Sequence, residues 1–277
     1  MFIITISRGS LSGAKSVSDA LTEKLGVPVI NREQVLEEAD KYAIRETGFT
    51  DISFIDRAPN VWDRQYYRSK HYRLAFQVAM LELVMKGSCV YEGHLGNLLL
   101  TGIPFVLSTR IIQPEEKRIQ HYIESNNVPY DYARNYIKLI DERRHHWSEF
   151  LYNVNIEDPY FYDLIINIDE ITIDSVVEML SLLVQRPEYN SNDDSMILLN
   201  NFYLMEKAKL YLFLAPVTRG IEVDVAADSA GKTLTIQGIH SVMDSDKSEM
   251  HIRSVLKKIE GIDKILFPNS GKNFYDK

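Results

Sequence analysis

The first sixteen residues combine the residue types and the spacing of a phosphate-binding loop. An apolar run at 2–6 predicts a buried strand, and it leads into a segment rich in Gly and Ser that ends at Ser16. The pattern Gly-x-x-x-x-Gly-Lys-Ser/Thr binds phosphate because its backbone N–H groups turn inward, its Lys reaches the outer phosphates and its hydroxyl ligates Mg²⁺. Gly9, Lys15 and Ser16 keep that spacing. We therefore expect Lys15 to be catalytic and Ser16 to hold the metal.

The loop departs from this pattern at Ala14, which stands where the second Gly belongs, while a Gly lies one place earlier at Gly13. Only Gly adopts positive φ freely, so a Cβ at this point would crowd a phosphate or prevent the required backbone. Two interpretations stay open. In one, the loop is an ordinary strand-to-helix turn, capped by Ser12 or Ser16, that binds no phosphate. In the other, it contacts nucleotide through Gly9, Ser10, Ser12, Gly13, Ala14, Lys15 and Ser16.

Composition sets the broad class of the protein. At 277 residues the chain has room for about two domains, and 45% hydrophobic with 25% charged residues is typical of a globular protein. The net charge of −8 argues against a nucleic-acid partner, which would need a basic surface. The single cysteine, Cys89, lies in an apolar run and is expected in a buried strand. We find no signal-peptide pattern and no apolar run of about 18 residues, and expect a cytoplasmic protein without a transmembrane segment.

The expected strands alternate with helical patterns along the first two thirds of the chain. The strands are expected at 2–6, 27–30, 88–92, 105–112 and 163–168, and the helices at 17–25, 32–44, 61–85, 115–125, 130–152 and 173–185. Nearly continuous apolar strands separated by helices predict a parallel sheet covered on both faces. Ligands bind at the carboxyl ends of such strands. The loop at 9–16, the segment 93–97 and the arginines after the fourth strand all fall there.

The last third of the chain differs in pattern. A polar segment at 186–194 predicts a linker, and a helical stretch at 196–209 follows it. Strands are then expected at 211–214, 221–225, 233–238 and 262–267, with a helix at 248–259. The expected domains are 1–186, a linker and connecting helix at 187–209, and a small α+β domain at 210–277.

Several motifs together make residues 1–185 resemble the cytidylate kinase-like branch of the P-loop nucleoside monophosphate kinases. The motifs are Ile6-Ser7-Arg8 with the loop at 9–16, Gly93 and Asn97 around His94, Gln113-Pro114-Glu115-Glu116-Lys117-Arg118, Asp141-Glu142-Arg143-Arg144, and Tyr162-Asp163-Leu164-Ile165-Ile166-Asn167. The resemblance implies an α/β P-loop NTPase fold with a five-stranded parallel sheet. It also implies ATP with Mg²⁺ and a small phosphorylated acceptor.

The same family pattern implies a lid helix that closes over the donor phosphates. Phosphoryl transfer needs cations over the charge that spreads on the equatorial oxygens. Arg143 and Arg144 are expected to supply them as catalytic groups, with Asp141 orienting one of them. The alternative is a solvated charged helix face. The adjacent His145 and His146 lack the i,i+4 spacing of a metal site and are expected on the lid surface.

A monophosphate acceptor requires arginines, whose guanidinium fork binds phosphate with two hydrogen bonds. Arg64 and Arg68 are four residues apart and share a helix face, with Arg73 close behind. Tyr66, Tyr67 and Tyr72 would stack on a base. The alternative is an amphipathic surface helix. The expected acceptor-binding residues are Arg32, Arg64, Arg68, Arg73, Gly93, His94 and Asn97.

His94 stands where the family has an Arg. A neutral His donates at most one hydrogen bond and carries charge only when its pKa is raised, so acceptor affinity or identity is in question. Glu92 could hold Mg²⁺ through water, or simply be hydrogen-bonded.

The C-terminal domain resembles a BON domain through Leu234-Thr235-Ile236-Gln237-Gly238 and Gly261-Ile262-Asp263-Lys264-Ile265. The resemblance implies contact with a small ligand or a membrane surface.

We consider three hypotheses: a kinase for a pyrimidine nucleoside monophosphate or a related small acceptor, a catalytically weak nucleotide sensor that signals through the C-terminal domain, and a purely structural protein with a vestigial loop. Ala14 and His94 favour the sensor, whereas Lys15, Ser16 and the segment 141–144 favour the kinase.

Overall fold

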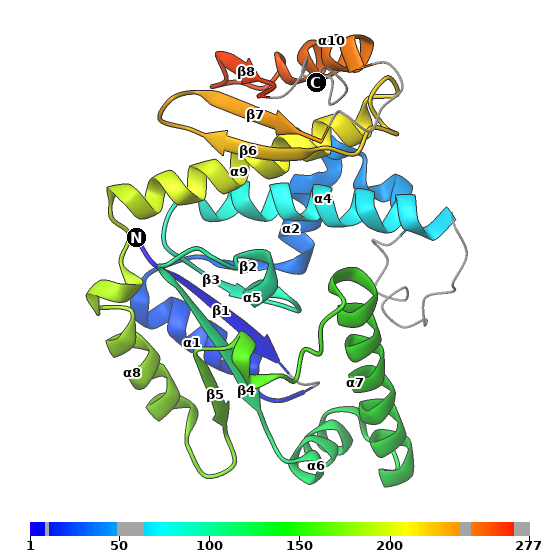
Figure 1. Cartoon of the computed structure of the whole chain (residues 1–277). Helices are drawn as coiled ribbons and strands as arrows, with labels where there is room; N and C mark the ends of the chain where they lie inside the picture. Colours follow the sequence, from blue (N-terminus) through cyan, green and yellow to red (C-terminus); the bar gives the residue numbers. More distant parts are fainter. Residues whose placement is uncertain (9–10, 49–63, 239–244, 269–277) are drawn as a thin grey trace.

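Strand β1 (Ile3–Arg8) lies at the centre of a five-stranded parallel sheet whose order is β2-β3-β1-β4-β5 (Figure 1). The structure is a computed structural model that describes residues 1–8, 11–48, 64–238 and 245–268. The side chains of Arg8, Arg64, Gln65 and Ser245 also lie outside this description. The other strands are β2 (Val29–Asn31), β3 (Cys89–Glu92), β4 (Val106–Ile112) and β5 (Leu164–Asn167).

The register brings the carboxyl ends of the strands to one edge of the sheet. Ile6 of β1 pairs with Glu92 of β3 on one side and with Thr109 of β4 on the other. Asn31, at the end of β2, also pairs with Glu92. The predicted five-stranded parallel sheet is confirmed, and its carboxyl edge collects the loops that follow β1, β3 and β4.

Helices cover both faces of the sheet. They are α1 (Ala14–Leu25), α2 (Arg32–Ala39), α4 (Arg64–Val84), α5 (Gly96–Leu99), α6 (Glu115–Asn126), α7 (Tyr130–Tyr152) and α8 (Ile173–Leu183), with short 3-10 turns η1 (Asp40–Tyr42), η2 (Ile44–Thr47), η3 (Pro159–Phe161) and η4 (Pro187–Tyr189). Ile4 and Ile6 of β1 point into a core with α1 and α8, whereas Ile3 points into a core with α2 and α4. Successive strand residues face opposite sides, so one strand supplies both cores.

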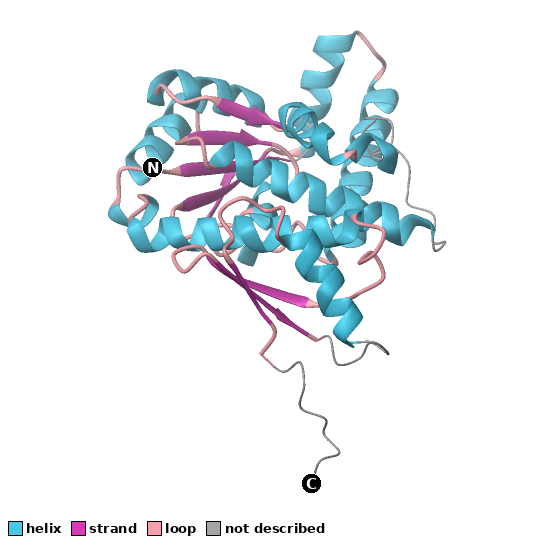
Figure 2. Cartoon of the chain, turned by 90° about the horizontal axis from the view of Figure 1, so that it is seen from above, coloured by secondary structure: helices cyan, strands magenta, loops and turns pink. Residues whose placement is uncertain are grey.

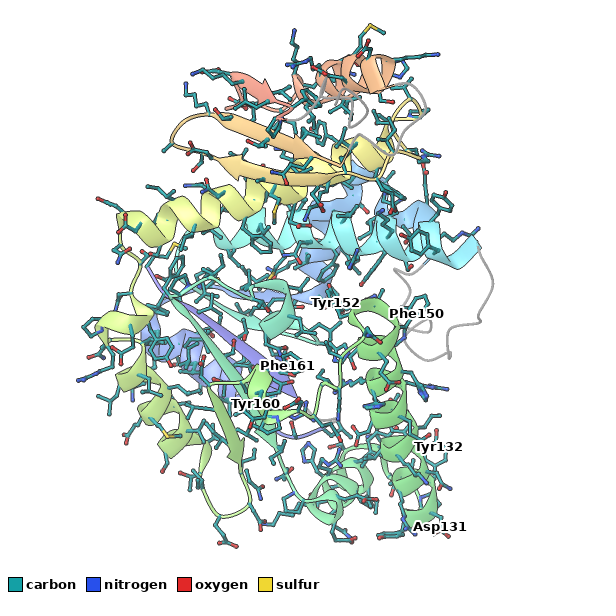
Figure 3. All side chains as sticks on the ribbon, viewed as in Figure 1. Asp131, Tyr132, Phe150, Tyr152, Tyr160 and Phe161 are labelled. Carbon is teal, nitrogen blue, oxygen red and sulfur yellow. The ribbon has the colours of Figure 1, made fainter. Side chains whose placement is uncertain are left out.

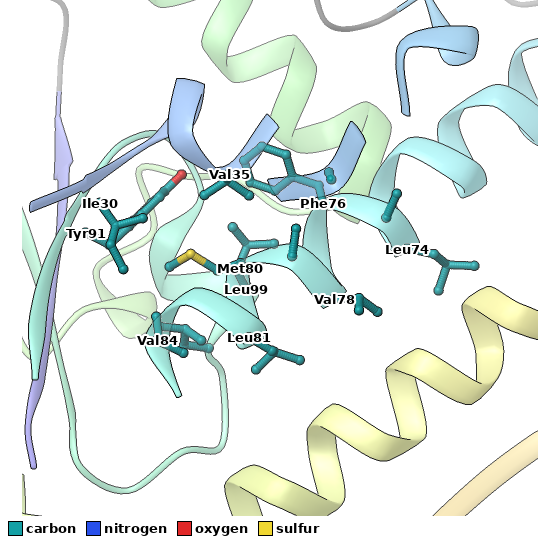
Figure 4. Close-up of a cluster of buried hydrophobic side chains, with 14 of the residues drawn as sticks. Ile30, Val35, Leu74, Phe76, Val78, Met80, Leu81, Val84, Tyr91 and Leu99 are labelled. Carbon is teal, nitrogen blue, oxygen red and sulfur yellow. The ribbon is translucent and has the colours of Figure 1, made fainter. Parts of the chain in front are cut away.

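The core beneath α4 joins α2, α4, α5 and the strands β2 and β3. Met80, Leu81 and Val84 of α4 have no exposed surface, and Figure 4 shows them packed with Ile30, Val35 and Leu99. Tyr91 of β3 is buried in the same cluster. This packing fixes α4 along the sheet, with its N-terminal half reaching past the carboxyl edge (Figure 1).

Helices α6 and α7 pack against each other beyond the carboxyl edge (Figure 1). Tyr122 of α6 stacks on Tyr136 of α7 with ring centroids 4.6 Å apart. Figure 3 shows Phe150 and Tyr152 at the end of α7 nearer to α4, and Tyr132 at its far end. Trp147 is buried in the core under α4, while Tyr132 is 56% exposed. The pair is therefore anchored at one end and projects from the body at the other.

The C-terminal unit is built from α9 (Asp193–Leu214), β6 (Asp224–Asp228), β7 (Thr233–Gln237), α10 (Ser245–Leu256) and β8 (Lys264–Leu266). Its sheet has the order β6-β7-β8, antiparallel between β6 and β7 and parallel between β7 and β8. The inward residues of these strands pack on α9 and α10, and in Figure 2 helices lie between the two sheets. The expected small α+β unit is thus present.

The strand predicted at 211–214 is wrong, because these residues belong to the last turn of α9. Leu199 and Leu210 of α9 are buried in the core beneath α4, whereas Leu204, Ala208 and Leu212 are buried in the core of the C-terminal unit. A helix buried on two sides is apolar around most of its circumference and loses the one-sided pattern of a surface helix. Helix α9 is therefore shared by both units. Within the described residues, no helix is long and apolar enough to span a lipid bilayer.

Candidate active site

The loop after β1 enters α1 through a left-handed glycine. Gly13 is the N-cap of α1, with φ +73°, and a Cβ on it would lie 2.6 Å from Cδ1 of Ile168. Leu11 is also left-handed, at φ +55°. Ala14 is the first residue of the helix, and only 1% of its surface is exposed. The glycine that this loop requires is Gly13, so the expectation that Ala14 blocks a positive φ is wrong.

The N-terminus of α1 has no side-chain cap, so the predicted capping by Ser12 or Ser16 is wrong, while phosphate binding by the loop stays a prediction. The hydroxyl of Ser12 is buried and has no hydrogen bond within the described chain. Free backbone N–H groups and the helix dipole favour an anion at such an end. The loop geometry is therefore suited to phosphate. Gly9 and Ser10 lie outside the described residues, so their predicted roles stay predictions.

Lys15 and Ser16 lie in the first turn of α1 with exposed side chains. Nζ of Lys15 is 2.8 Å from the carboxylate of Asp19, one turn along the helix, and 69% of the Lys15 side chain is exposed. An exposed ion pair of this kind contributes only about 0–1 kcal/mol. Lys15 can therefore leave Asp19 for a phosphate at small cost.

Three arginines from different elements converge on a hollow of about 140 Å³ at the carboxyl edge. Arg110 comes from β4, Arg118 from α6 and Arg144 from α7. Only 11% of the Arg110 side chain and 13% of the Arg118 side chain are exposed. Arg110 donates to the carbonyl of Ile156 at 3.2 Å. Two carboxylates line the same hollow: Asp141 pairs with Arg118 at 2.7 Å, and Glu157 lies 3.8 Å from Arg110. The three guanidinium groups outnumber these two carboxylates, so the hollow favours an anion.

Asp141 of α7 pairs with Arg118 of α6. The distance from Oδ2 of Asp141 to Nη1 of Arg118 is 2.7 Å. Arg144 lines the hollow with both residues, whereas Arg143 is not among the residues that line it. The structure therefore brings together Asp141 and Arg144 of the predicted lid residues, and adds Arg118 to them.

His94 lies where this hollow meets a second, aromatic one, and it lines both. Burial and then the charge of Arg144 lower the pKa of His94 from 6.5 to about 3, although the nearby backbone of Arg144 acts in the opposite direction. Both ring nitrogens are buried without a hydrogen bond of normal geometry in the described chain. His94 is therefore a neutral side chain that can donate one hydrogen bond and accept another.

The aromatic hollow lies between α2, α4, β3, α5 and α7. It is lined by Arg32, Tyr72, Phe76, Tyr91, His94, Leu95, Leu99, Trp147, Leu151 and Tyr152. Asn31 caps α2 with its side chain and so fixes Arg32 at the first position of that helix. Arg32 also hydrogen-bonds Tyr72, whose pKa burial raises. The aromatic hollow has a volume of about 40 Å³, so little space is left inside it while α7 covers it.

Gly93 and Asn97 support the floor of this region. A Cβ on Gly93 would lie 2.6 Å from the hydroxyl of Tyr91, so the glycine allows the chain to pass the ring. Asn97 donates to the carbonyl of Phe161 at 3.3 Å, and its own Oδ1 is buried without a hydrogen bond in the described chain. Figure 3 shows Phe161 beside Tyr160, which is 95% exposed.

Of the α4 arginines whose side chains the structure describes, Arg68 and Arg73 do not line the hollow of Arg32 and His94. Arg68 and Arg73 are exposed and line hollows that α4 forms with residues of α9 and of the segment after it. Arg64 begins α4, and its side chain lies outside the described residues. Of the predicted acceptor-binding residues, Arg32 and His94 line one pocket, with Gly93 and Asn97 next to it.

No group of three or more His, Cys, Asp or Glu side chains in the described part of the chain is arranged to hold a metal ion. A Mg²⁺ ion at a kinase site needs few protein ligands, because it keeps waters and phosphate oxygens in its shell. Ser16 in the first turn of α1 fits this donor set. Glu92 lies beside Ile6 in the sheet register, at the carboxyl edge.

Comparison with known families decides the class of this fold. The model of the cytidylate kinase-like family matches residues 3–170. The chain belongs to the cytidylate kinase-like family. Membership in this kinase-like family supports phosphoryl transfer as the general class of activity. The C-terminal unit, from α9 onward, lies outside the match.

Solved structures agree with the fold. An uncharacterized protein from Eubacterium ventriosum is 21% identical with a TM-score of 0.50, covering 67% of this chain and 99% of its own. Shikimate kinase from Bacteroides thetaiotaomicron is 15% identical with a TM-score of 0.39, over 67% of this chain and 99% of its own. The first likeness shows the fold alone, and the second is too distant to carry an argument. No curated protein matches the chain.

Arg110 and Arg118 line the arginine hollow, although neither was assigned a role from the sequence and Arg118 was named only as the last residue of the motif at 113–118. Arg110 interrupts the apolar β4, where a buried charge is unusual, and that interruption is a usable signal. Arg118 lies one turn into α6, and no pattern in the sequence shows that it faces Asp141 across the helix pair. Its position follows from the packing of α6 on α7.

Proposed function

We propose that the protein transfers a phosphoryl group from ATP to a nucleoside monophosphate of the cytidylate type or to a related small acceptor. The observation that carries the proposal is the convergence of Arg110, Arg118 and Arg144 at the carboxyl edge of the sheet, the edge at which β1 also ends and leads to the uncapped N-terminus of α1. Phosphoryl transfer is largely positioning and charge neutralisation, and these groups are suited to both. Family membership supports the same class of reaction.

On the donor side, the free N–H groups of the α1 terminus would hold the phosphates, with Lys15 reaching the outermost one. Arg144 and Arg118 would neutralise charge on the transferred group, since both line the same hollow. Asp141 holds Arg118 in place. Ser16 is the residue that would hold Mg²⁺, which when bound would supply positive charge against the charge that develops on the phosphates.

On the acceptor side, the aromatic hollow would hold the ring of the acceptor. Tyr72 and Tyr91 offer apolar faces, and Arg32 is the cation that lines the hollow with them. His94 lies between this hollow and the arginine hollow, so it would touch the acceptor group that receives the phosphoryl. Helix α7 covers both hollows and would exclude water during transfer, as lids do in kinases.

The test is a turnover assay with ATP, Mg²⁺ and one acceptor at a time from CMP, dCMP, UMP and AMP. We expect Lys15→Ala to abolish turnover while circular dichroism shows an unchanged fold. Lys24→Ala, at the other end of α1, is the matched control and should keep wild-type turnover. A Lys15→Ala protein as active as the wild type would contradict the proposal.

A second candidate function is a catalytically weak nucleotide sensor. The neutral state of His94 favours it, because the aromatic hollow then offers one guanidinium where a monophosphate dianion calls for more. Calorimetric titration separates the two functions, since the sensor binds ATP but turns over none of the four monophosphates. Under this alternative His94→Arg should restore turnover.

The domain limits and the role of the C-terminal unit are also proposals. We propose that the kinase-like domain spans 1–186 and that the unit after the 187–209 connection is a BON-like domain that contacts a ligand, a partner or a membrane surface. Its order of elements, helix, two strands, helix and strand, supports a small ligand-binding module. We propose a cytoplasmic location, which fractionation of cells would test.

A further inference from the structure

A cleft of about 480 Å³ separates the N-terminal half of α4 from the C-terminal unit, on the far side of α4 from the aromatic hollow. Its walls are α4, the end of α9 and the segment leading into β6. Figure 1 shows α9 running beside α4. Ligand pockets of small molecules commonly measure about 300–1,000 Å³ and occur at domain interfaces. We call this hollow the interdomain cleft.

Basic side chains outnumber acidic ones in the interdomain cleft, although the whole chain carries a net charge of −8. The cations are Lys70 and Arg73 from α4, Lys209 from α9 and Arg219 from the turn after it, and the acids are Glu222 and Asp224. Lys70 pairs with Glu222 at 3.0 Å, and Lys209 pairs with Glu206 of its own helix at 2.8 Å. Arg73 and Arg219 are then set against Asp224 alone. An excess of positive charge therefore remains at a site enclosed by protein on several sides.

Two of these cations face the cleft without a carboxylate partner. Arg73 has no hydrogen bond or ion pair to any part of the chain that the structure describes. Arg219 donates only to backbone carbonyls, from Nε to Phe213 at 3.3 Å and from Nη2 to Leu214 at 3.2 Å. These bonds hold the Arg219 side chain in place and leave its charge uncompensated. The two guanidinium groups come from different elements, α4 and the turn after α9.

The remaining wall of the cleft is apolar. Leu74, Leu212, Phe213 and Val225 line it. A second hollow of about 600 Å³ shares Phe213 and Arg219 as lining residues and adds the exposed Arg68. An apolar wall beside unpaired guanidinium groups matches a molecule with a ring and an anionic group, and the arginine fork is suited to phosphate.

We propose that the interdomain cleft binds a small organic phosphate, with its phosphate between Arg73 and Arg219 and its ring against Leu212 and Phe213. This site is separate from the kinase-like site and does not depend on the proposed function. Helix α4 connects the two, because Lys70 and Arg73 face the cleft while Tyr72 and Phe76 line the aromatic hollow. The ligand would thus contact the helix that forms a wall of the other site.

The test uses phenyl phosphate as the probe and methyl NMR of the full chain as the readout. We expect saturable shifts of the Leu74, Leu212 and Val225 methyl groups, with Arg73→Ala weakening the affinity by about tenfold through the loss of a charged hydrogen-bond donor. Arg186→Ala, an exposed arginine outside the cleft, is the control and should leave the affinity unchanged. Lys15→Ala should also leave it unchanged.

Related probes separate the contributions of ring and charge. Benzyl alcohol should give no saturable shift at these methyl groups, and inorganic phosphate should bind more weakly than phenyl phosphate. The proposal is overturned if millimolar phenyl phosphate leaves the cleft methyl groups unmoved, or if Arg73→Ala binds it as the wild type does. Shifts confined to Val17 of α1 would assign the anion to the phosphate loop instead and would equally overturn it.

Discussion

At the scale of single residues, the phosphate loop depends on Gly13 more than on the substitution at Ala14. Gly13→Ala places a Cβ in the left-handed region, which costs about 1–2 kcal/mol, and presses it against Ile168. Ala14→Gly changes a residue with ordinary helical backbone and should cost about 1 kcal/mol or less. We expect urea unfolding to show the larger loss for Gly13→Ala. Nucleotide affinity should fall in that variant only.

The contribution of the clash can be separated from that of the backbone. In a Gly13→Ala/Ile168→Ala double variant the Cβ no longer meets Cδ1 of Ile168, so the double variant should lose less stability than the two single losses added together. If the losses in free energy of unfolding were strictly additive, the clash would contribute nothing. Equal losses for Gly13→Ala and Ala14→Gly would contradict the assignment of Gly13 as the required glycine.

Because of His94, the free energy of unfolding should decrease as the pH falls. Its pKa is about 3 in the folded protein against 6.5 ordinarily, so between these values the unfolded chain binds more protons than the folded one. Stability from this group is therefore complete above pH 6.5 and is lost as the pH falls toward 3. His94→Gln cannot take up the proton, and its free energy of unfolding should decline less steeply over this range. Parallel curves for the two proteins would contradict the buried neutral state.

Some site residues can be predicted from their near neighbours in the sequence, whereas the surroundings of others depend on distant parts of the chain. Gly9, Lys15 and Ser16 lie within eight positions, so their spacing alone predicts a phosphate loop. The sequence predicts that Arg68 and Arg73 lie on one helix. It does not predict which residues lie opposite them, because that depends on how the C-terminal unit packs beside α4. Spacing along a helix gives a shared face and does not say what covers it.

At the scale of elements, the Arg118–Asp141 pair joins α6 to α7. Only 13% of the Arg118 side chain and 33% of the Asp141 side chain are exposed, so the pair is partly shielded from water. We expect Asp141→Asn to lower the free energy of unfolding by about 1–3 kcal/mol, between the values of exposed and buried pairs. The same variant should increase hydrogen exchange in α6 and the facing turns of α7.

Glu142→Gln is the matched control on the same helix. Glu142 lies 3.9 Å from Lys138, and both side chains are more than half exposed. Exposed pairs of this spacing are worth about 0.3–0.5 kcal/mol, so this variant should be nearly as stable as the wild type. If Asp141→Asn were as mild as Glu142→Gln, the pair would not be what holds the two helices together.

Most helices and strands could be predicted because the hydrophobic pattern of each segment matches the burial of its residues in the fold. Helix α7 has the predicted limits 130–152, since its apolar residues repeat at helical spacing on one side of a charged helix. The end of α9 was predicted as a strand because Leu212, Phe213 and Leu214 form an unbroken apolar run. Those residues are apolar for two different reasons, as Phe213 packs in one core and Leu212 in the other. No single-element pattern contains that information.

At the scale of the whole molecule, the shared helix α9 should make the two units unfold together. Leu256 of α10 is fully buried in the core of the C-terminal unit, and Leu256→Ala should cost about 2–5 kcal/mol. Trp147 reports on the other core, beneath α4. In a Trp62→Phe background Trp147 is the only tryptophan of the chain, so its fluorescence follows that core alone.

We expect Leu256→Ala to lower the urea midpoint of the Trp147 transition, although the two residues lie in separate cores. The reason is that loss of the C-terminal core exposes Leu204 and Leu212 of α9 and removes the support that holds Leu199 and Leu210 of the same helix against α4. If circular dichroism instead showed an early transition while the Trp147 midpoint stayed at its original value, the units would be independent. Coupling through α9 would then be excluded, and any effect of the interdomain cleft on the kinase-like site would have to pass through α4 alone.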